Sequence, residues 1–90
     1  MTTKTKVRNF EGSNGAVKNQ FLIEDGNRTI FQSYDSVIAV KEYGQPTQLD
    51  ERYWDYSKTT GKYRNQFLGE DKKETERKIK DGTYILTNLN

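Results

Sequence analysis

The sequence contains no cysteine and no histidine. Without cysteine, the chain can form no disulfide, no thiolate metal site and no thiol nucleophile. Without histidine, it lacks the most common general base and the most common transition-metal ligand. We therefore expect a protein that is not an enzyme and that needs no metal ion and no cofactor.

Apolar residues are also scarce. They make up 31% of the chain, against about 45–50% in ordinary globular proteins. The longest uninterrupted apolar run covers residues 37–40, whereas a helix needs ~20 apolar residues to cross a bilayer. The first six residues lack the apolar core of a signal peptide. We expect no membrane partner and a location in the cytoplasm.

What the chain does contain is aromatic residues and balanced charge. Six Tyr, four Phe and one Trp each bury about 150–250 Å² when packed, so few are needed for a core. The 15 basic and 13 acidic residues nearly cancel, whereas disordered chains combine low hydrophobicity with high net charge. A chain of 90 residues supplies a single core. We predict one domain over residues 7–90, preceded by a frayed polar segment, residues 1–6.

The first half of the chain predicts strands joined by tight turns. A short strand is expected at residues 7–10, and the Gly-Ser-Asn-Gly stretch after it predicts a turn. Residues 17–23 show the alternation of a half-buried strand, with Val17, Phe21 and Ile23 on the inner face.

A hairpin is predicted next. Asp25 and Gly26 form the dipeptide typical of a type I′ turn, because both residues tolerate positive φ. A two-residue loop at this dipeptide places Ile23 opposite Arg28. The returning strand then covers residues 28–34.

The next strands are shorter. Residues 37–40 are apolar and largely β-branched, which predicts the most buried strand. Residues 47–49 can pair back briefly after the turn at Pro46.

The pattern then changes to a helical period. One helix is expected over residues 57–68. A second begins at Asp71, where Glu74 completes a capping-box-like start, and it ends at Gly82. Residues 83–86 can return to the sheet. The sequence thus predicts an α+β fold: a small antiparallel, twisted sheet of four to six strands with N-terminal hairpins and two short helices of the C-terminal half on one face.

Three segments, residues 7–10, 31–36 and especially the block YWDYSKTTGKYRNQFLGE at residues 53–70, resemble a family of small uncharacterised proteins. Its members are encoded by bacteriophages, archaeal viruses and related mobile elements. The resemblance covers nearly the whole chain. It implies a stand-alone viral accessory protein in the cytoplasm of the infected host cell, and it supplies no catalytic residue.

Charge is distributed unevenly. Residues 58–80 contain eight basic and four acidic residues, whereas the remainder has seven basic and nine acidic. Cations that neutralise phosphates, with aromatic rings that stack on bases, are typical of a nucleic-acid surface. The candidate binding residues for a partner or a nucleic acid are Tyr53, Tyr56, Lys58, Lys62, Tyr63, Arg64, Lys72, Lys73 and Arg77.

A structural interpretation explains the same residues. In it, residues 72–80 form a solvated helix face with Glu74–Lys78 and Glu76–Lys80 pairs. Tyr63 and Phe67 lie in the core, and Trp54 fills the centre of that core. The rings at positions 53, 54 and 56 cannot all point inward, so at least one tyrosine is expected at an interface.

Carboxylates are the remaining catalytic candidates. Asp50, Glu51 and Asp55 are close in sequence, but two catalytic carboxylates need environments that separate their pKa values, usually through burial. These three are expected in an exposed connection, where they act as solvated caps. This favours a protein without catalytic activity.

Two functions follow. The first is a virus-encoded accessory protein that binds a host or viral macromolecule, most readily a protein, in the manner of small counter-defence inhibitors such as anti-CRISPR proteins. The alternative is direct binding of DNA or RNA through residues 58–80. A small structural or nucleotide-sequestering viral protein is a further alternative, and the oligomeric state stays open.

Overall fold

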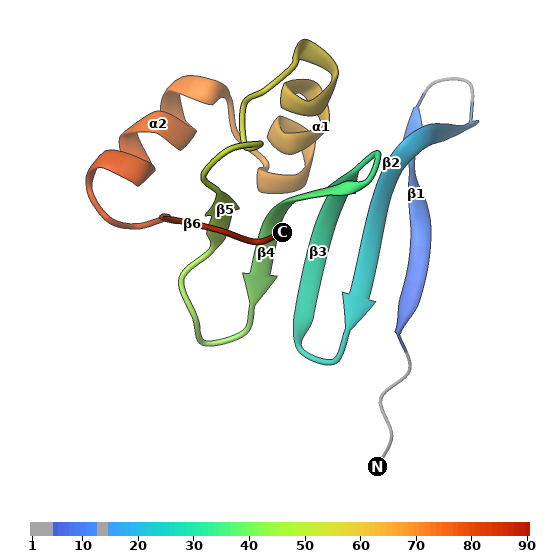
Figure 1. Cartoon of the computed structure of the whole chain (residues 1–90), viewed down its shortest axis with the longest axis horizontal. Coiled ribbons are helices and arrows are strands. Elements are labelled where there is room, and N and C mark those ends of the chain that lie inside the picture. Colours follow the sequence, from blue (N-terminus) through green and yellow to red (C-terminus); the bar gives the residue numbers. More distant parts are fainter. Residues whose placement is uncertain (1–4, 13–14) are drawn as a thin grey trace.

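The computed structural model describes residues 5–12 and 15–90 of the chain. Its elements are β1 (Lys6–Gly12), β2 (Gly15–Asp25), β3 (Arg28–Ser33), β4 (Ser36–Glu42), β5 (Gln48–Asp50), α1 (Lys58–Leu68), α2 (Lys72–Lys80) and β6 (Ile85–Thr87). The six strands form one sheet in the order β1-β2-β3-β4-β5-β6 (Figure 1). The first five run antiparallel to their neighbours, and β6 pairs with β5 in parallel. The predicted α+β fold is confirmed.

The helices cover only part of the sheet. Both lie toward one end of it, and the far ends of β1 to β4, with the β2–β3 turn, project away from them (Figure 1). α1 and α2 contribute to the same core, since Tyr63, Phe67 and Ile79 pack in one cluster with residues of the sheet. This leaves a second sheet face without helices.

The N-terminal expectations hold in part. Lys6 is already the first residue of β1, so the prediction that this residue belongs to a frayed segment was wrong. Residues 1–4 and the predicted turn residues 13–14 lie outside the described part of the chain. Gly12 and Gly15 are paired across β1 and β2.

The β2–β3 hairpin is confirmed, but its loop lies one residue later than predicted, which shifts each cross-strand partner by two residues. Asp25 pairs with Arg28, and Ile23 therefore faces Ile30 instead of Arg28. The side chains of Asp25 and Arg28 also form an ion pair at 2.9 Å, which favours this register. The loop is Gly26-Asn27, and only Gly26 has positive φ, at 66°, the sign pattern of a II′ turn.

The predicted inner face of β2 was also wrong in part. Leu22 packs against the core together with Val17, whereas Ile23 lies on the opposite face of the sheet. Val17 and Leu22 are an odd number of residues apart, so strict alternation along a strand would place them on opposite faces of the sheet. Asn19 lies between them with φ of 64°, and this irregularity resets the alternation.

The core is built around Phe31, which is fully buried. Its ring centre lies 5.2 Å from that of Phe10 and 5.8 Å from that of Phe67. Tyr63 packs on Phe10 at 5.5 Å. Trp54 was expected at the centre but is half-buried at the edge of this cluster. The phenylalanines occupy the centre because they face one another from two strands and from α1.

The ends of the second helix follow the predicted capping, and the first helix is capped as well. Ser57 caps α1 and accepts a hydrogen bond from Thr60 N, and Asp71 caps α2 and accepts from Glu74 N. Gly82 follows the second helix with φ of 85°, as expected for a residue after a helix C-terminus. No helix within residues 5–12 and 15–90 is long and apolar enough to cross a membrane.

Candidate functional site

Arg64, predicted as an exposed binding residue, is only 1% exposed, and that expectation of exposure was wrong. Its Nη1 donates to the Trp54 carbonyl at 2.8 Å and to Asp55 Oδ1 at 2.9 Å. Its Nη2 donates to Asn65 Oδ1 at 2.9 Å. The guanidinium also lies 5.2 Å from the Trp54 ring. Arg64 therefore ties α1 to the segment before it.

Asp55 joins this arrangement to the second helix. It also forms an ion pair with Lys72 Nζ, at 2.6 Å. Burial alone would raise the pKa of Asp55, but the hydrogen bonds and charges of Lys72 and Arg64 outweigh it, so the pKa lies below its ordinary value. Asp55 is half-buried, and the prediction that it is a solvated cap was wrong.

Asp50 is likewise buried, at 1% exposure, instead of exposed as expected. Its carboxylate accepts hydrogen bonds from the backbone N–H groups of Arg52, Tyr53 and Leu89. Burial would raise its pKa, but these hydrogen bonds hold it below the ordinary value. It caps two chain segments, while Glu51 is exposed.

The other predicted residues separate into two groups. Tyr63 is buried in the core, as the structural interpretation expected. Arg77 pairs with Glu74 and Asp81 on the surface of α2. Lys58, Lys62 and Lys73 are exposed, and no ion pair joins any of these three lysines to another described residue.

The lysine pairing within α2 differs from the expected one. Lys78 does not pair with Glu74 but with Glu70, at 2.7 Å. Glu70 also accepts from Thr75 Oγ1 and from the Tyr84 hydroxyl, both at 2.7 Å. This buried carboxylate joins α2 to the segment before β6.

The tyrosines before α1 contact each other. The rings of Tyr53 and Tyr56 meet edge to face with centres 5.6 Å apart. Tyr56 is 48% exposed, which agrees with the expectation that at least one ring reaches the surface. Its role as an interface residue stays a prediction.

A shallow basic groove of about 610 Å³ lies along the first half of α1. Its charged lining consists of Lys58, Lys62, Arg64 and Lys72 with a single carboxylate, Asp55. The groove thus unites four of the nine predicted residues, and the other five lie outside it.

The face of the sheet without helices carries an apolar row that the sequence analysis missed. Cross-strand pairing aligns Val7 with Ile23, Ile23 with Ile30, and Ile30 with Val40. Gln48 and Ile85 continue the row onto β5 and β6. We call Val7, Ile23, Ile30, Val40 and Ile85 the open-face row.

Exposure within the open-face row is uneven. Val7 is 61% exposed and Ile85 is 42% exposed, while Ile23 and Ile30 are half-buried by their neighbours. Val40 is buried, and it lines a small cavity with Gln45 and Pro46 of the β4–β5 loop. The row was missed because only the observed register brings these residues together.

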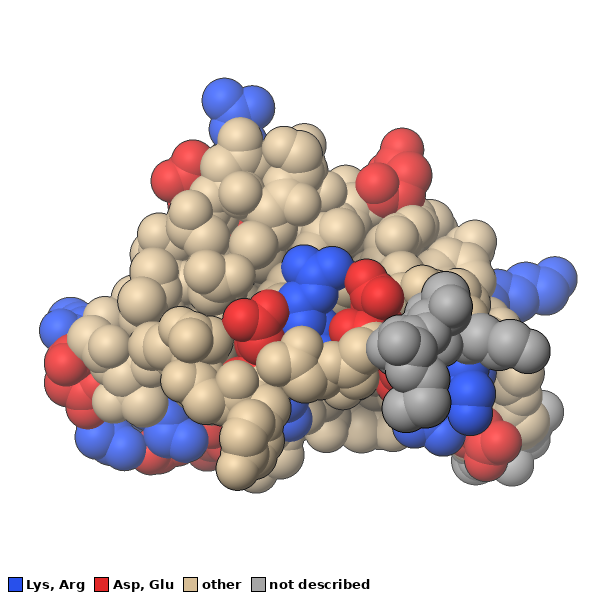
Figure 2. Space-filling model, turned by 90° about the horizontal axis from the view of Figure 1, so that it is seen from below, with Lys and Arg blue, Asp and Glu red and all other residues tan. Residues whose placement is uncertain are grey.

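Charges near the row neutralise one another. Arg28 lies between Asp25, at 2.9 Å, and Glu42, at 4.0 Å. Figure 2 views the molecule from the lower end of Figure 1 and shows Lys and Arg beside Asp and Glu, with broad uncharged surface between them. This side of the molecule has no continuous basic patch among the residues drawn in colour.

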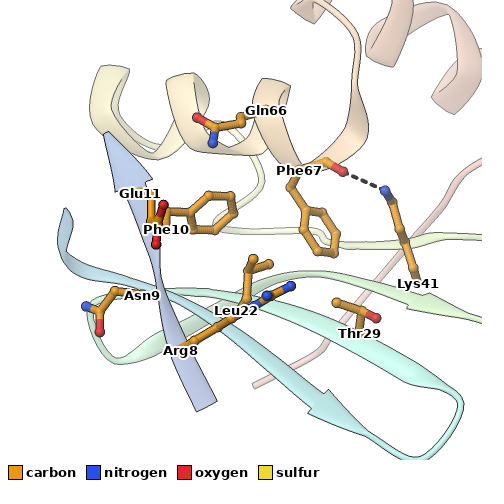
Figure 3. A pocket seen from close by; sticks show the side chains of 9 residues that line it. All are labelled: Arg8, Asn9, Phe10, Glu11, Leu22, Thr29, Lys41, Gln66 and Phe67. Atoms are coloured by element: carbon orange, nitrogen blue, oxygen red, sulfur yellow. Dashed lines mark hydrogen bonds between the residues drawn. The ribbon is translucent and has the colours of Figure 1, made fainter. Parts of the chain in front are cut away.

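A cleft of about 490 Å³ opens between the end of α1 and the sheet (Figure 3). Phe10, Leu22 and Phe67 give it apolar walls. Its polar lining is Arg8, Asn9, Glu11, Thr29, Lys41 and Gln66. None of these residues was predicted as a site from the sequence, because they come from five different elements.

The comparisons with known proteins identify a family whose function is unknown. No curated protein and no solved structure matches the chain. The model of a family of unknown function, DUF8033, matches residues 3–82, and the chain therefore belongs to this family.

Proposed function

We propose that this protein is a non-enzymatic binding protein that docks a partner protein on the open-face row. The observation that supports this is a line of Val and Ile side chains across the uncovered face of an antiparallel sheet. Such a face is ordinarily polar, because one side of an antiparallel sheet packs on the core and the other meets water. Contiguous apolar surface on a single domain is typical of an interaction site.

The lack of charge along the row indicates the kind of surface that the partner protein presents. The row itself has no charged side chain, and Arg28 beside it is neutralised by Asp25 and Glu42. An uncharged row suits an uncharged, aliphatic surface on another protein. With strands about 4.8 Å apart, six strands span about 24 Å. A second row on this face, Phe21, Gln32 and Val37, widens the footprint toward the ~800 Å² per partner of a stable interface.

This face does not suit nucleic acid. Phosphates are bound by cations whose counterions are released on binding, and Arg28, a cation beside the row, is already paired with two carboxylates. Because residues 53–70 resemble small proteins of viruses and mobile elements, we propose that the partner is a host or viral protein in an infected cell. Docking would then block a host defence protein.

The experiment compares two matched variants. Val7→Thr, Ile23→Thr and Ile30→Thr together remove apolar surface but retain β-branched side chains suited to strands. Lys58→Gln with Lys62→Gln is the control on the other side of the molecule. A partner is first captured from cells that produce the protein, then purified and titrated calorimetrically. We expect at least tenfold weaker binding for the threonine variant and unchanged binding for the control.

Equal affinity of a folded threonine variant would contradict docking on the row. Sedimentation of the protein alone tests whether the row instead binds a second copy of the chain. In that case dimers would form with rising concentration and would be lost in the threonine variant. This result would overturn the proposal of a different partner protein.

Direct nucleic-acid binding is the second candidate, and the basic groove favours it. Four cations meet one carboxylate there, and Lys58 and Lys62 form no ion pair with any described residue. Binding through phosphates predicts a slope of log K against log[salt] of about −0.7 to −0.9 per contact. Mobility-shift titrations with single- and double-stranded nucleic acid test this, and no shift at low salt would exclude it. Lys58→Glu with Lys62→Glu should flatten the slope.

A further inference from the structure

The cleft in Figure 3 has a separate chemistry from the open-face row. Its walls are rigid, because Phe10 and Phe67 both pack on the buried ring of Phe31. Leu22 forms the part of the floor between them. Concave apolar sites of about 300–1,000 Å³ with a few placed polar groups are typical of small-ligand pockets, and this cleft, at about 490 Å³, falls in that range.

Two cations line the cleft, Lys41 from β4 and Arg8 from β1. Lys41 Nζ donates to the Phe67 carbonyl at 2.5 Å and lies 4.6 Å from the Phe67 ring centre. Arg8 pairs with Glu24 at 3.0 Å, and Glu24 is the cross-strand neighbour of Thr29, which in turn faces Lys41. Register therefore brings the Arg8 guanidinium toward the side that holds Thr29 and Lys41.

The Lys41 ammonium has no carboxylate within ion-pair distance among the described residues. Burial lowers the pKa of Lys41, and the more distant charge of Glu70 offsets this only in part. A partly desolvated cation with only a carbonyl and a ring as partners gains from an anion beside it. Arg8 is held by one carboxylate, and its exposed side chain leaves further guanidinium N–H groups free to donate.

The opposite side of the cleft is different. Glu11 and Gln66 lie there, near Phe10 (Figure 3). A carboxylate and an amide oxygen accept hydrogen bonds from an N–H group. The cleft thus combines two cations, an apolar centre formed by Phe10, Leu22 and Phe67, and two hydrogen-bond acceptors near Phe10.

We propose that this cleft binds an apolar carboxylate whose acid group lies beside Lys41 and Arg8, whose aromatic or aliphatic body covers Phe10, Leu22 and Phe67, and whose N–H group faces Glu11. This chemistry is shared by free N-acylated apolar acids and by the C-terminal residue of a peptide. The site is independent of docking on the open-face row.

The test uses N-acetylphenylalanine and its uncharged amide as probes, followed by amide NMR spectra of the whole chain. The acid should shift the backbone signals of Phe10, Leu22 and Phe67 and bind at least tenfold more tightly than the amide. Lys41→Met and Arg8→Met should each reduce that preference, while Lys62→Met, outside the cleft, should leave it unchanged. Lys41→Met removes the hydrogen bond to the Phe67 carbonyl and can therefore lower the melting temperature. If it does, the result for Arg8→Met decides the test.

A peptide that ends in phenylalanine with a free carboxylate shows whether the natural ligand is a peptide C-terminus or a free acid. Binding more than tenfold tighter than N-acetylphenylalanine supports a peptide C-terminus, and equal binding supports a free acid. The proposal is overturned if acid and amide bind equally, if the acid shifts no cleft residue, or if neither methionine variant changes the preference. Loss of binding in the threonine variant of the open-face row would also contradict it, because that variant leaves the cleft intact.

Discussion

The guanidinium of Arg64 and the carboxylate of Asp55 meet at 2.9 Å although the two residues lie on different segments, one inside α1 and one before it. Asp55 also holds Lys72 at the start of α2. Asp55 therefore joins the segment before α1 to both helices, through Arg64 in α1 and Lys72 in α2.

Replacing Arg64 with methionine should lower the free energy of unfolding by about 2–3 kcal/mol. The variant keeps an unbranched apolar stem but removes the guanidinium and its hydrogen bonds to Trp54, Asp55 and Asn65. Urea denaturation followed by Trp54 fluorescence measures the free energy of unfolding. The native-state emission of Trp54 also reports the removal of the guanidinium that lies beside its ring. Lys62→Met on the exposed side of α1 is the control and should stay within about 0.5 kcal/mol. Equal effects would mean that Arg64 contributes no more than a surface lysine.

Gln20 should be replaceable with a gain in stability. Its side chain is fully buried, and neither its amide nitrogen nor its amide oxygen has a hydrogen-bond partner. A buried amide without partners costs roughly 1–3 kcal/mol. Gln20→Met keeps a similar shape and should raise the melting temperature in a thermal scan. A destabilised variant would show that the amide has a partner in solution, such as a bound water.

Acid should destabilise the protein through three carboxylates. The pKa values of Asp50, Asp55 and Glu70 lie below their ordinary values because hydrogen bonds and neighbouring cations outweigh burial. The stability that these groups supply is present above the unfolded-state pKa, 3.8 for Asp and 4.5 for Glu, and is lost as the pH falls through the lower folded-state values. Melting temperatures should therefore decline below about pH 4.5.

The same titration has an internal control. The chain has no histidine, the side chain whose charge ordinarily changes between about pH 5 and pH 8, so the melting temperature should be nearly flat there. Asp55→Asn should weaken the acid dependence. A curve as steep in that variant as in the parent would contradict the assignment of Asp55 to this effect.

Gly26→Val should destabilise the β2–β3 hairpin. Gly26 has φ of 66°, a conformation that costs a residue with a side chain about 1–2 kcal/mol and a β-branched residue more. Asn27→Val, in the same loop, is the comparison because Asn27 does not have positive φ. Thermal melts should show a larger loss for the glycine variant, and equal losses would argue against the turn conformation.

Local signals allowed much of the fold to be predicted from the sequence. Asp71 and Gly82 mark the ends of the second helix through a side chain and a backbone conformation, and these positions agree with the structure. The β2–β3 turn was located by Asp25 and Gly26, but the dipeptide alone does not decide which residues form the loop. That choice depends on cross-strand pairs, which the sequence does not display.

The candidate sites could be predicted far less well, for the same reason. Arg64 was taken as exposed because a helix period alone does not show that a long side chain reaches back to Asp55 and the Trp54 carbonyl. The open-face row and the cleft depend on register between strands. Asn19 has positive φ, and this irregularity interrupts the regular alternation of side chains between the two faces of β2. Sites formed by several elements become visible only when these pairings are known.

Because β1 to β5 follow one another in space in chain order, each of their pairings closes a short loop, and such local contacts form quickly. The parallel pairing of β5 with β6 is different, since residues 51–84, with both helices, lie between the two strands. Closing a longer loop costs more chain entropy. The meander should therefore form first during folding, and β6 should join the sheet last, once the Asp55, Arg64 and Lys72 contacts have aligned the two helices.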